Sequence, residues 1–150
     1  MIIREYTLQD KNEVLALLRL NTPNCFSPHE EKDLVYYLDN EIELYFVIEI
    51  DNLIAGCGGI NFSTDKTIAK ISWDIIHPSF QGKGIGSALL KYRLEKLKTI
   101  NTTLKIMVRT SQLVYLFYEK LGFTLIKTVD DYWAAGFHMY EMEYVKQNKV

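Results

Sequence analysis

The chain has 150 residues, 48% of them hydrophobic, which is enough for a single domain over residues 1–150 with a core of its own. Its 17 basic and 19 acidic side chains leave a formal net charge of −2, and Lys and Arg are scattered along the sequence, which disfavours a nucleic-acid partner. Two cysteines far apart argue against a disulfide framework or a zinc site, and no run approaches the ~20 apolar residues of a membrane span, so we expect a cytoplasmic protein.

The first third of the chain is predicted to form one strand and two helices. Residues 2–6 read as a short strand, and Thr7 is typical of a residue that caps the start of a helix. This helix should end before Pro23, and the segment 21–28 is rich in helix breakers and should be a loop. A second helix is predicted over residues 30–38, with its apolar side chains on one face.

Strands predominate in the rest of the chain. Residues 44–50 and 53–61 are typical of a hairpin with Asp51-Asn52 as its turn. The further elements are expected to be a strand over 68–77, a helix over 88–97, a strand over 103–108, a helix over 111–121, and strands over 123–129 and 136–145. This order predicts an α/β (α+β) fold, in which a mixed, mostly antiparallel twisted sheet of about seven strands is flanked by four helices.

A glycine-rich turn, Gln81-Gly-Lys-Gly-Ile-Gly-Ser87, separates the strand over residues 68–77 from the helix that follows it. Glycine allows the backbone to approach a ligand closely, and the first turn of a helix has N–H groups without intrahelical partners. Together with the positive end of the helix dipole, these donors favour the binding of a phosphate or pyrophosphate.

The spacing of the glycines distinguishes three families of phosphate-binding loop. The Walker pattern requires Ser or Thr directly after its lysine, but Lys83 is followed by Gly84. The dinucleotide-binding pattern requires a third glycine where this chain has Ser87. A nucleotide triphosphatase and a nicotinamide enzyme are therefore disfavoured, and a purely structural glycine turn is the plain alternative.

The remaining pattern, a glutamine followed by G-x-G-x-G, resembles the acyl-CoA-binding segment of the GCN5-related N-acetyltransferase (GNAT) family. A second segment, Val108 to Phe123, is similar to the later motif of the same family and closes in Tyr-Glu-Lys-Leu-Gly-Phe. Two motifs in the right order strengthen the resemblance, which is strongest from Val47 to Phe123. One departure is Ser111, since many members of the family have Asn at that position.

The resemblance implies a fold in which two neighbouring strands diverge and the pantetheine arm of acetyl-CoA, the co-substrate, lies in the gap like an extra strand. The amides of the glycine turn would hold the pyrophosphate, and Lys83 would add positive charge near it. The residues expected to contact acetyl-CoA are Ile75, Ile76, His77, Gln81, Gly82, Lys83, Gly84, Ile85, Gly86, Ser87, Ser111 and Tyr118.

Tyr118 and Asp74 are the expected catalytic residues. Tyr118 stands at the position of the family's general acid, and a tyrosine with an ordinary pKa of ~10 is protonated at neutral pH and can protonate a departing thiolate. Its structural alternative is a core aromatic. Asp74 lies within an apolar strand, where a carboxylate must be paired or face a cavity, and it is the first candidate for the base. The alternative for Asp74 is an ion pair that fixes the strand, in which case another side chain or ordered water could serve as the base. His77 is favoured as a loop residue or CoA contact. Glu141 is expected to face solvent.

The acceptor pocket is expected to come from two loops outside the CoA-binding gap. In the family, the loop between the first two helices and the loop before the last strand commonly form this pocket, which here indicates residues 24–26 and 130–133. Cys25, Phe26, Asp74 and Trp133 are the predicted acceptor-binding residues. Carboxylates and aromatic rings together could receive a cationic amine, although an exposed acidic turn anchored by a tryptophan fits equally well.

The sequence therefore predicts an N-acetyltransferase that moves the acetyl group from acetyl-CoA directly to a primary amine of a small molecule or peptide, without a metal. Transfer through Cys25 or Cys57 is disfavoured, because neither has an activating His or helix start nearby in the sequence. A CoA-binding sensory or regulatory module without turnover is the alternative. A homodimer with residues 137–144 as its seam is compatible with either function.

Overall fold

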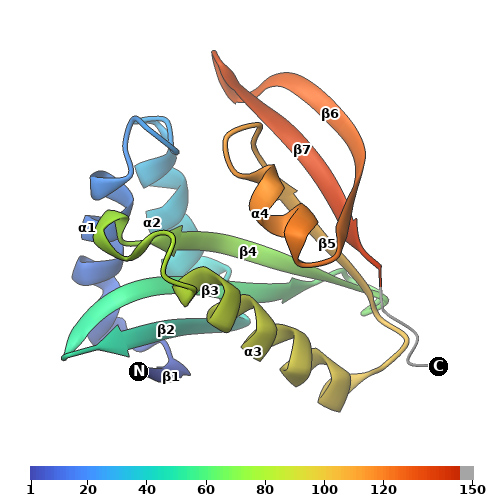
Figure 1. Ribbon diagram of the computed structural model, residues 1–150, viewed down its shortest axis with the longest axis horizontal. Coiled ribbons are helices and arrows are strands. Elements are labelled where there is room, and N and C mark those ends of the chain that lie inside the picture. Colours follow the sequence, from blue (N-terminus) through green and yellow to red (C-terminus); the bar gives the residue numbers. More distant parts are fainter. Residues whose placement is uncertain (146–150) are drawn as a thin grey trace.

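The computed structural model describes residues 1–145, in which a seven-stranded sheet carries helices on both faces (Figure 1). The elements are β1 (Ile2–Glu5), η1 (Leu8–Asp10), α1 (Lys11–Leu20), α2 (Glu30–Asn40), β2 (Leu44–Ile50), β3 (Leu53–Phe62), β4 (Ile68–Ile76), η2 (Pro78–Phe80), α3 (Ile85–Ile100), β5 (Lys105–Thr110), α4 (Tyr115–Lys120), β6 (Phe123–Ala134) and β7 (Phe137–Tyr144). The strand order is β1-β2-β3-β4-β5-β7-β6, with β4 and β5 parallel and the other neighbours antiparallel. The predicted fold class is confirmed.

Helices α1 and α2 cover one face of the N-terminal strands, α3 covers the other face of these strands, and α4 packs against β6. The side chains of β2 alternate between the two layers: Tyr45 and Val47 pack with α1 and α2, whereas Phe46 packs with α3. The start of the first helical segment is capped as expected, since the Thr7 N–H donates to the Asp10 carboxylate at 2.8 Å. None of the helices in residues 1–145 is long and apolar enough to cross a membrane.

The hairpin between β2 and β3 turns at the expected residues. Asp51 and Asn52 have φ angles of 51° and 64°, the left-handed conformation that a tight two-residue hairpin turn requires. The β2–β3 pairing then runs from Ile50–Leu53 back to Leu44–Ile60, with one irregularity. Strand β3 therefore lies between β2 and β4 in the sheet.

The sheet opens between β4 and β5. These strands pair only over Ile68–Ile71 and Lys105–Val108. Beyond that point β4 continues along β3, and β5 continues along β7, so the two halves of the sheet separate, as the rise of β6 and β7 away from β4 shows (Figure 1). The structure therefore has the divergent strands that the family resemblance implies.

Two elements differ from the sequence prediction. Helix α4 begins at Tyr115 rather than at Ser111, because the Ser111 carbonyl accepts the N–H groups of Val114 and Tyr115 in a turn before the helix. Strand β6 continues through residues 130–133, which were predicted as a loop, because the pairing with β7 resumes at Ala134 after an irregularity. Strand β7 is flanked by β5 and β6, so a homodimer through residues 137–144 would have to use a face of this strand.

Candidate active site

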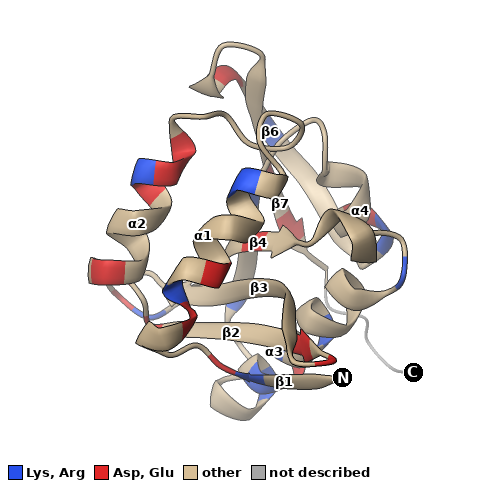
Figure 2. Ribbon diagram, turned by 90° about the vertical axis from the view of Figure 1, so that its left-hand side faces the viewer, with Lys and Arg blue, Asp and Glu red and all other residues tan. Residues whose placement is uncertain are grey.

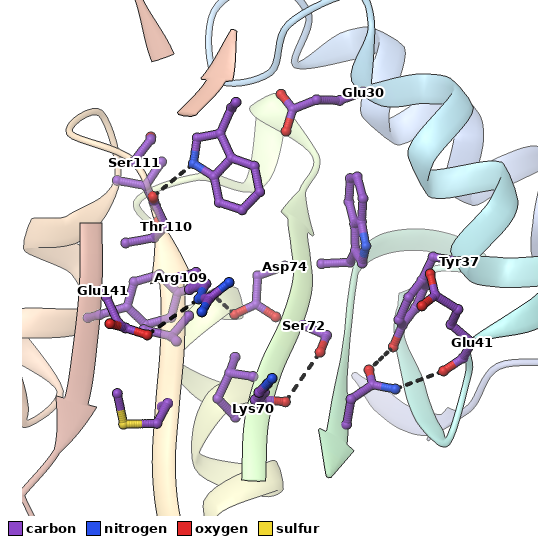
Figure 3. Close-up of a pocket in the computed structure, with 18 of the residues that line it drawn as sticks. Glu30, Tyr37, Glu41, Lys70, Ser72, Asp74, Arg109, Thr110, Ser111 and Glu141 are labelled. Atoms are coloured by element: carbon purple, nitrogen blue, oxygen red, sulfur yellow. Dashed lines mark hydrogen bonds and ion pairs between the residues drawn. The ribbon is translucent and has the colours of Figure 1, made fainter. Parts of the chain in front are cut away.

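A pocket of ≈ 1280 Å³ lies where β4 and β5 diverge (Figure 3). Its walls come from the loop after α1, from α2, β4, β5 and α4, and from the hairpin of β6 and β7. Six of the predicted site residues line it, namely Cys25, Phe26, Asp74, Ser111, Tyr118 and Trp133. The structure thus brings both predicted catalytic residues together with all the predicted acceptor-binding residues.

Tyr118 and Asp74 are in direct contact. The Tyr118 hydroxyl, on α4, donates a hydrogen bond of 2.6 Å to Oδ2 of Asp74, on β4. The Tyr118 side chain is buried, and both this burial and the charge of Asp74 raise its pKa well above the ordinary value, so the phenol is protonated at neutral pH. Tyr118 is therefore both a core aromatic and a proton donor placed beside a carboxylate.

Asp74 is also paired with a residue that the sequence prediction missed, Arg93. Its Oδ1 lies 2.6 Å from Nη1 of Arg93, whose side chain is only 1% exposed. The same Nη1 donates to the Gly59 carbonyl at 3.0 Å, and Nε donates to the Leu89 carbonyl at 3.3 Å. Burial lowers the pKa of Arg93, but the Asp74 carboxylate outweighs this effect, and the net change is upward. The ion pair considered as the alternative for Asp74 is therefore present, together with the bond to Tyr118.

A local distortion of β4 accompanies the position of Asp74. Trp73 has a φ of 51°, which is a strained value for an aromatic residue, and the register with β3 shifts at this point. The Trp73 carbonyl accepts a hydrogen bond of 2.9 Å from the hydroxyl of Tyr45, a buried residue of β2. Figure 3 shows the Asp74 side chain projecting from β4 into the pocket.

The glycine turn leads directly into α3. Gly82 and Gly84 have φ angles of 78° and 80°, and a Cβ atom at either position would meet nothing within 4 Å. The turn therefore needs glycine for its backbone conformation rather than for lack of space. Gln81 anchors the turn, because its Nε2 donates to Oδ1 of Asn21 at 3.0 Å and to the Ile76 carbonyl at 3.3 Å.

Charged side chains of both signs line the pocket. Arg109 and Glu141 form an ion pair of 3.3 Å between β5 and β7. The expectation that Glu141 faces solvent is wrong, because its register opposite Arg109 turns it toward the pocket, where its side chain is 17% exposed. Besides Asp74, five further charged residues line the walls, namely Glu30, Glu41, Glu43, Lys70 and Lys105. Figure 3 labels Glu30, Glu41 and Lys70 among them.

One end of the pocket is aromatic and acidic. Phe26 stacks on Trp73 with ring centres 6.3 Å apart, and Trp133 is fixed by a hydrogen bond of 3.1 Å from its Nε1 to the Thr110 carbonyl. An adjoining recess of ≈ 310 Å³ is lined by Glu30, Asp33, Tyr36, Glu41, Trp73 and Trp133. Its carboxylates lie along α2, where acidic residues gather near the helix start (Figure 2).

The family described as acetyltransferase (GNAT) domain matches residues 41–125, more than half of the chain and the part that contains β4, the glycine turn and α4. The chain belongs to the GNAT family of acetyltransferases. GNAT enzymes use acetyl-CoA as co-substrate, and the predicted family membership is confirmed.

Relatives of this GNAT domain include amino-acid acetyltransferases. The chain is 28% identical over 123 residues to that of Vibrio vulnificus, covering 79% of this chain and 26% of the relative. It is 27% identical over 133 residues to that of Pasteurella multocida, covering 85% and 28%. The chain therefore spans about a quarter of the length of these curated relatives.

Solved GNAT structures share the fold. An aminoglycoside 6′-N-acetyltransferase complexed with coenzyme A has a TM-score of 0.76 and 18% identity, covering 99% of this chain and 100% of that chain. The ribosomal-protein-S18-alanine N-acetyltransferase from Escherichia coli has a TM-score of 0.78 and 17% identity, covering 99% and 98%. At these identities, the likeness concerns the fold.

The predicted CoA contacts of the GNAT domain fall into two groups. Ile85, Gly86 and Ser87 form the first turn of α3, next to Gly82, Lys83 and Gly84. The others are Ile75, Ile76 and His77 at the end of β4, Gln81 after η2, Ser111 before α4, and Tyr118 within α4. The His77 N–H donates to the Ala55 carbonyl at 2.8 Å and its Nδ1 accepts the Ser79 N–H at 3.0 Å, so both groups are engaged within the chain. The Ser111 hydroxyl accepts the Leu113 N–H at 3.2 Å, and the Ile75 side chain is buried in the core. Because the His77 amide points to β3, the Ile76 amide points toward the open side of β4.

The sequence contains a pattern from which the burial of Arg93 could have been predicted. Arg93 is a lone charge on the face of α3 that is formed by Leu89, Leu90, Leu94 and Leu97, all of which are buried. A buried arginine requires a counter-charge, and Asp74 is the acidic residue of β4. Trp73 gave no comparable signal, because its strained backbone depends on the pairing of β3 with β4. In residues 1–145, no three His, Cys, Asp or Glu side chains come together as candidate metal ligands.

Proposed function

We propose that this chain transfers the acetyl group from acetyl-CoA directly to a primary amine of a small molecule or peptide. The observation that carries the proposal is the 2.6 Å hydrogen bond between Tyr118 and Asp74 at the point where β4 and β5 separate. A phenol and a carboxylate in contact, both lining one pocket, are the acid and base that acetyl transfer to an amine requires.

The two groups have opposite tasks in the reaction. An alkyl amine with a pKa of ~10.4 must lose a proton to attack the thioester, and Asp74 is placed to accept it. The departing sulfur of CoA requires a proton, and Tyr118 is placed to donate it. The amides at the start of α3 would hold the pyrophosphate, with the charge of Lys83 beside them.

The cysteines favour direct transfer over an acyl-enzyme. Burial raises the pKa of Cys25, which lines the pocket, and raises that of the buried Cys57 to about 12. Because the thiolate is the nucleophilic form, neither cysteine is activated at neutral pH. We therefore expect no acetylated protein in the intact mass after incubation with acetyl-CoA alone.

The aromatic and acidic end of the pocket is the proposed entrance for the acceptor. Cys25, Phe26 and Trp133 line the same pocket as Asp74. Carboxylates attract an ammonium group, and the faces of Trp73 and Trp133 can bind it through cation–π contacts. This chemistry suits an acceptor that arrives as a cation and loses a proton close to Asp74.

The test is a thiol-release screen with acetyl-CoA. The panel contains a free amino acid, an aminoglycoside, a peptide that begins with alanine, and a polyamine, because the relatives and structural neighbours act on different acceptors by name. Thiol release with at least one amine supports transfer. Tight CoA binding by calorimetry without release from any amine would instead indicate a sensory or regulatory module.

Tyr118→Phe tests the proposed acid. The variant keeps the aromatic ring in the core but has no proton to give to sulfur, so we expect kcat to fall by about 100-fold or more while the Kd of acetyl-CoA stays within about 3-fold. Tyr115→Phe, on the same helix, is the matched control, because no hydrogen bond joins Tyr115 to Asp74. Equal turnover in the two variants would remove Tyr118 from the mechanism.

A further inference from the structure

We propose that Arg93 is a positioning residue of the transfer reaction, which orients the carboxylate of Asp74 so that one oxygen serves both Tyr118 and the acceptor amine. The inference rests on the proposed function, and it assigns a role to a buried residue that is not among those lining the pocket and is ion-paired with Asp74, which does line it.

Arg93 is fixed from three sides. Its Nη1 lies 2.6 Å from Asp74 and donates to the Gly59 carbonyl of β3, and its Nε donates to the Leu89 carbonyl one turn earlier on α3. A guanidinium is planar and always charged, so these contacts define the plane in which its charge lies. Burying this charge is costly unless a counter-ion is close, and Asp74 is that counter-ion.

The two carboxylate oxygens of Asp74 are thereby divided between two tasks. Oδ1 is fully buried against Arg93 and accepts no well-aligned hydrogen bond, so this contact is an ion pair. Oδ2 accepts the Tyr118 hydroxyl at 2.6 Å. The Asp74 side chain is 14% exposed and lines the pocket, and because Oδ1 is buried against Arg93, Oδ2 is the oxygen available to a ligand there. A carboxylate oxygen can accept a second hydrogen bond, which leaves a position for the amine.

An acceptor that arrives as an ammonium loses two protons in the reaction. Asp74 passes the first to bulk water before the attack, and the second moves from nitrogen to sulfur within the site. Asp74 takes this second proton from the attacking nitrogen, Tyr118 gives its hydroxyl proton to the departing sulfur, and Tyr118 regains a proton from Asp74. The C–N bond forms, the C–S bond breaks, and one proton has passed from nitrogen to sulfur. Arg93, Asp74 and Tyr118 therefore end the turnover with the charges with which they began it.

The other titratable groups around Asp74 are neutral or paired with each other. Tyr37 of α2, Tyr45 of β2 and Cys57 of β3 are buried, and burial raises the pKa of each. Arg109 and Glu141 neutralise each other across the pocket. Arg93 is thus the cation in contact with Asp74 among residues 1–145. Its removal should change the orientation of this carboxylate rather than that of the other groups in the pocket.

The experiment compares Arg93→Met with Lys91→Met in the kcat of acetyl transfer and the KM of acetyl-CoA. Lys91 is an exposed residue of the same helix, and it makes no contact with Asp74. Without the guanidinium, the carboxylate loses the contact that orients it toward Tyr118. We expect Arg93→Met to lower kcat at neutral pH by about 10- to 100-fold, with the KM of acetyl-CoA within about 3-fold.

A kcat equal to that of Lys91→Met would overturn the proposal. If circular dichroism shows that Arg93→Met is unfolded, Arg93→Lys decides the question. Lysine keeps the charge but lacks the planar guanidinium that contacts Gly59 and Asp74 together, so we expect kcat to fall by about 3- to 10-fold. Wild-type kcat in Arg93→Lys would then overturn the positioning role.

The proposed function can fail separately. Wild-type protein that releases no thiol with any amine of the panel contradicts the proposed function and, with it, this inference. Wild-type protein that turns over, while the Arg93 variants behave like Lys91→Met, contradicts the inference alone.

Discussion

At the scale of single residues, the position of Gly58 shows how tightly the ion pair is enclosed. A Cβ atom at this position on β3 would overlap Oδ1 of Asp74 and would lie 2.8 Å from Nη1 of Arg93. Neither partner can move freely, since Arg93 is fully buried and Asp74 is bonded to Tyr118. The absence of a side chain at Gly58 is therefore a condition for the contact between α3 and β4.

Gly58→Ala should consequently impair both stability and turnover. Overpacking of this kind costs about 1–3 kcal/mol of unfolding free energy, and displacement of Asp74 should lower kcat at saturating acetyl-CoA by about 10-fold or more. Gly56→Ala on the same strand is the matched control, because a Cβ there crowds Ile76 and Ile48 but not the ion pair. Chemical denaturation and steady-state rates are the measurements. A loss of stability with kcat equal to that of Gly56→Ala would contradict the prediction.

At the scale of elements, the glycine turn combines a backbone requirement with a proposed binding role. Gly84 caps α3 with a φ of 80°, and Gly136, in the turn between β6 and β7, has a φ of 81°. A Cβ atom at either glycine would meet nothing within 4 Å. The two positions therefore impose the same conformational cost on any other residue, but only Gly84 lies beside the amides that should hold the pyrophosphate.

Gly84→Ala and Gly136→Ala separate these two effects. Both should lower the unfolding free energy by about 1 kcal/mol, because alanine avoids the left-handed conformation. Only Gly84→Ala should weaken CoA binding, by about 10-fold, since the cradle of amides must distort to relieve the strain. Calorimetric titration with CoA measures the difference. Equal CoA affinity in the two variants would show that the turn is structural rather than ligand-binding.

Elements with local signals could be predicted, and those that depend on distant pairing could not. The hairpin turn at Asp51-Asn52 and the break before α3 carry their own turn chemistry, and both were predicted correctly. Residues 130–133 have turn-like composition, yet they belong to β6 because β7 pairs beyond them. The prediction followed local preference where tertiary pairing determines the outcome.

In the candidate site, too, single residues could be predicted from local signals, whereas contacts between distant elements could not. Tyr118 and Asp74 were selected one at a time, and the structure shows that they are in contact. Arg93 was missed because its partner lies 19 positions away on another element, and only the packing of α3 on β4 brings them together. The direction of Glu141 likewise depends on the register between β5 and β7.

At the scale of the whole molecule, the two halves of the sheet share a hydrophobic core but are joined by only a short stretch of backbone pairing. One half consists of β1–β4 and the other of β5, β7 and β6, and the parallel pairing between them covers only residues 68–71 and 105–108. Beyond this pairing, the bond from Tyr118 to Asp74 crosses the opening. A ligand that binds between β4 and β5 would add contacts to both halves at once.

Acetyl-CoA should therefore stabilise the whole domain. Binding at 100 times the Kd adds about 2.7 kcal/mol to the unfolding free energy, which corresponds to a rise in Tm of about 5–10 °C for a domain of this size. Pantetheine, which would reach only the opening, and ADP, which would reach only the start of α3, should each give a smaller shift at the same concentration. Differential scanning calorimetry measures all three ligands. An unchanged Tm at saturating acetyl-CoA would contradict binding between the two halves, because any ligand selective for the folded state must raise the transition temperature.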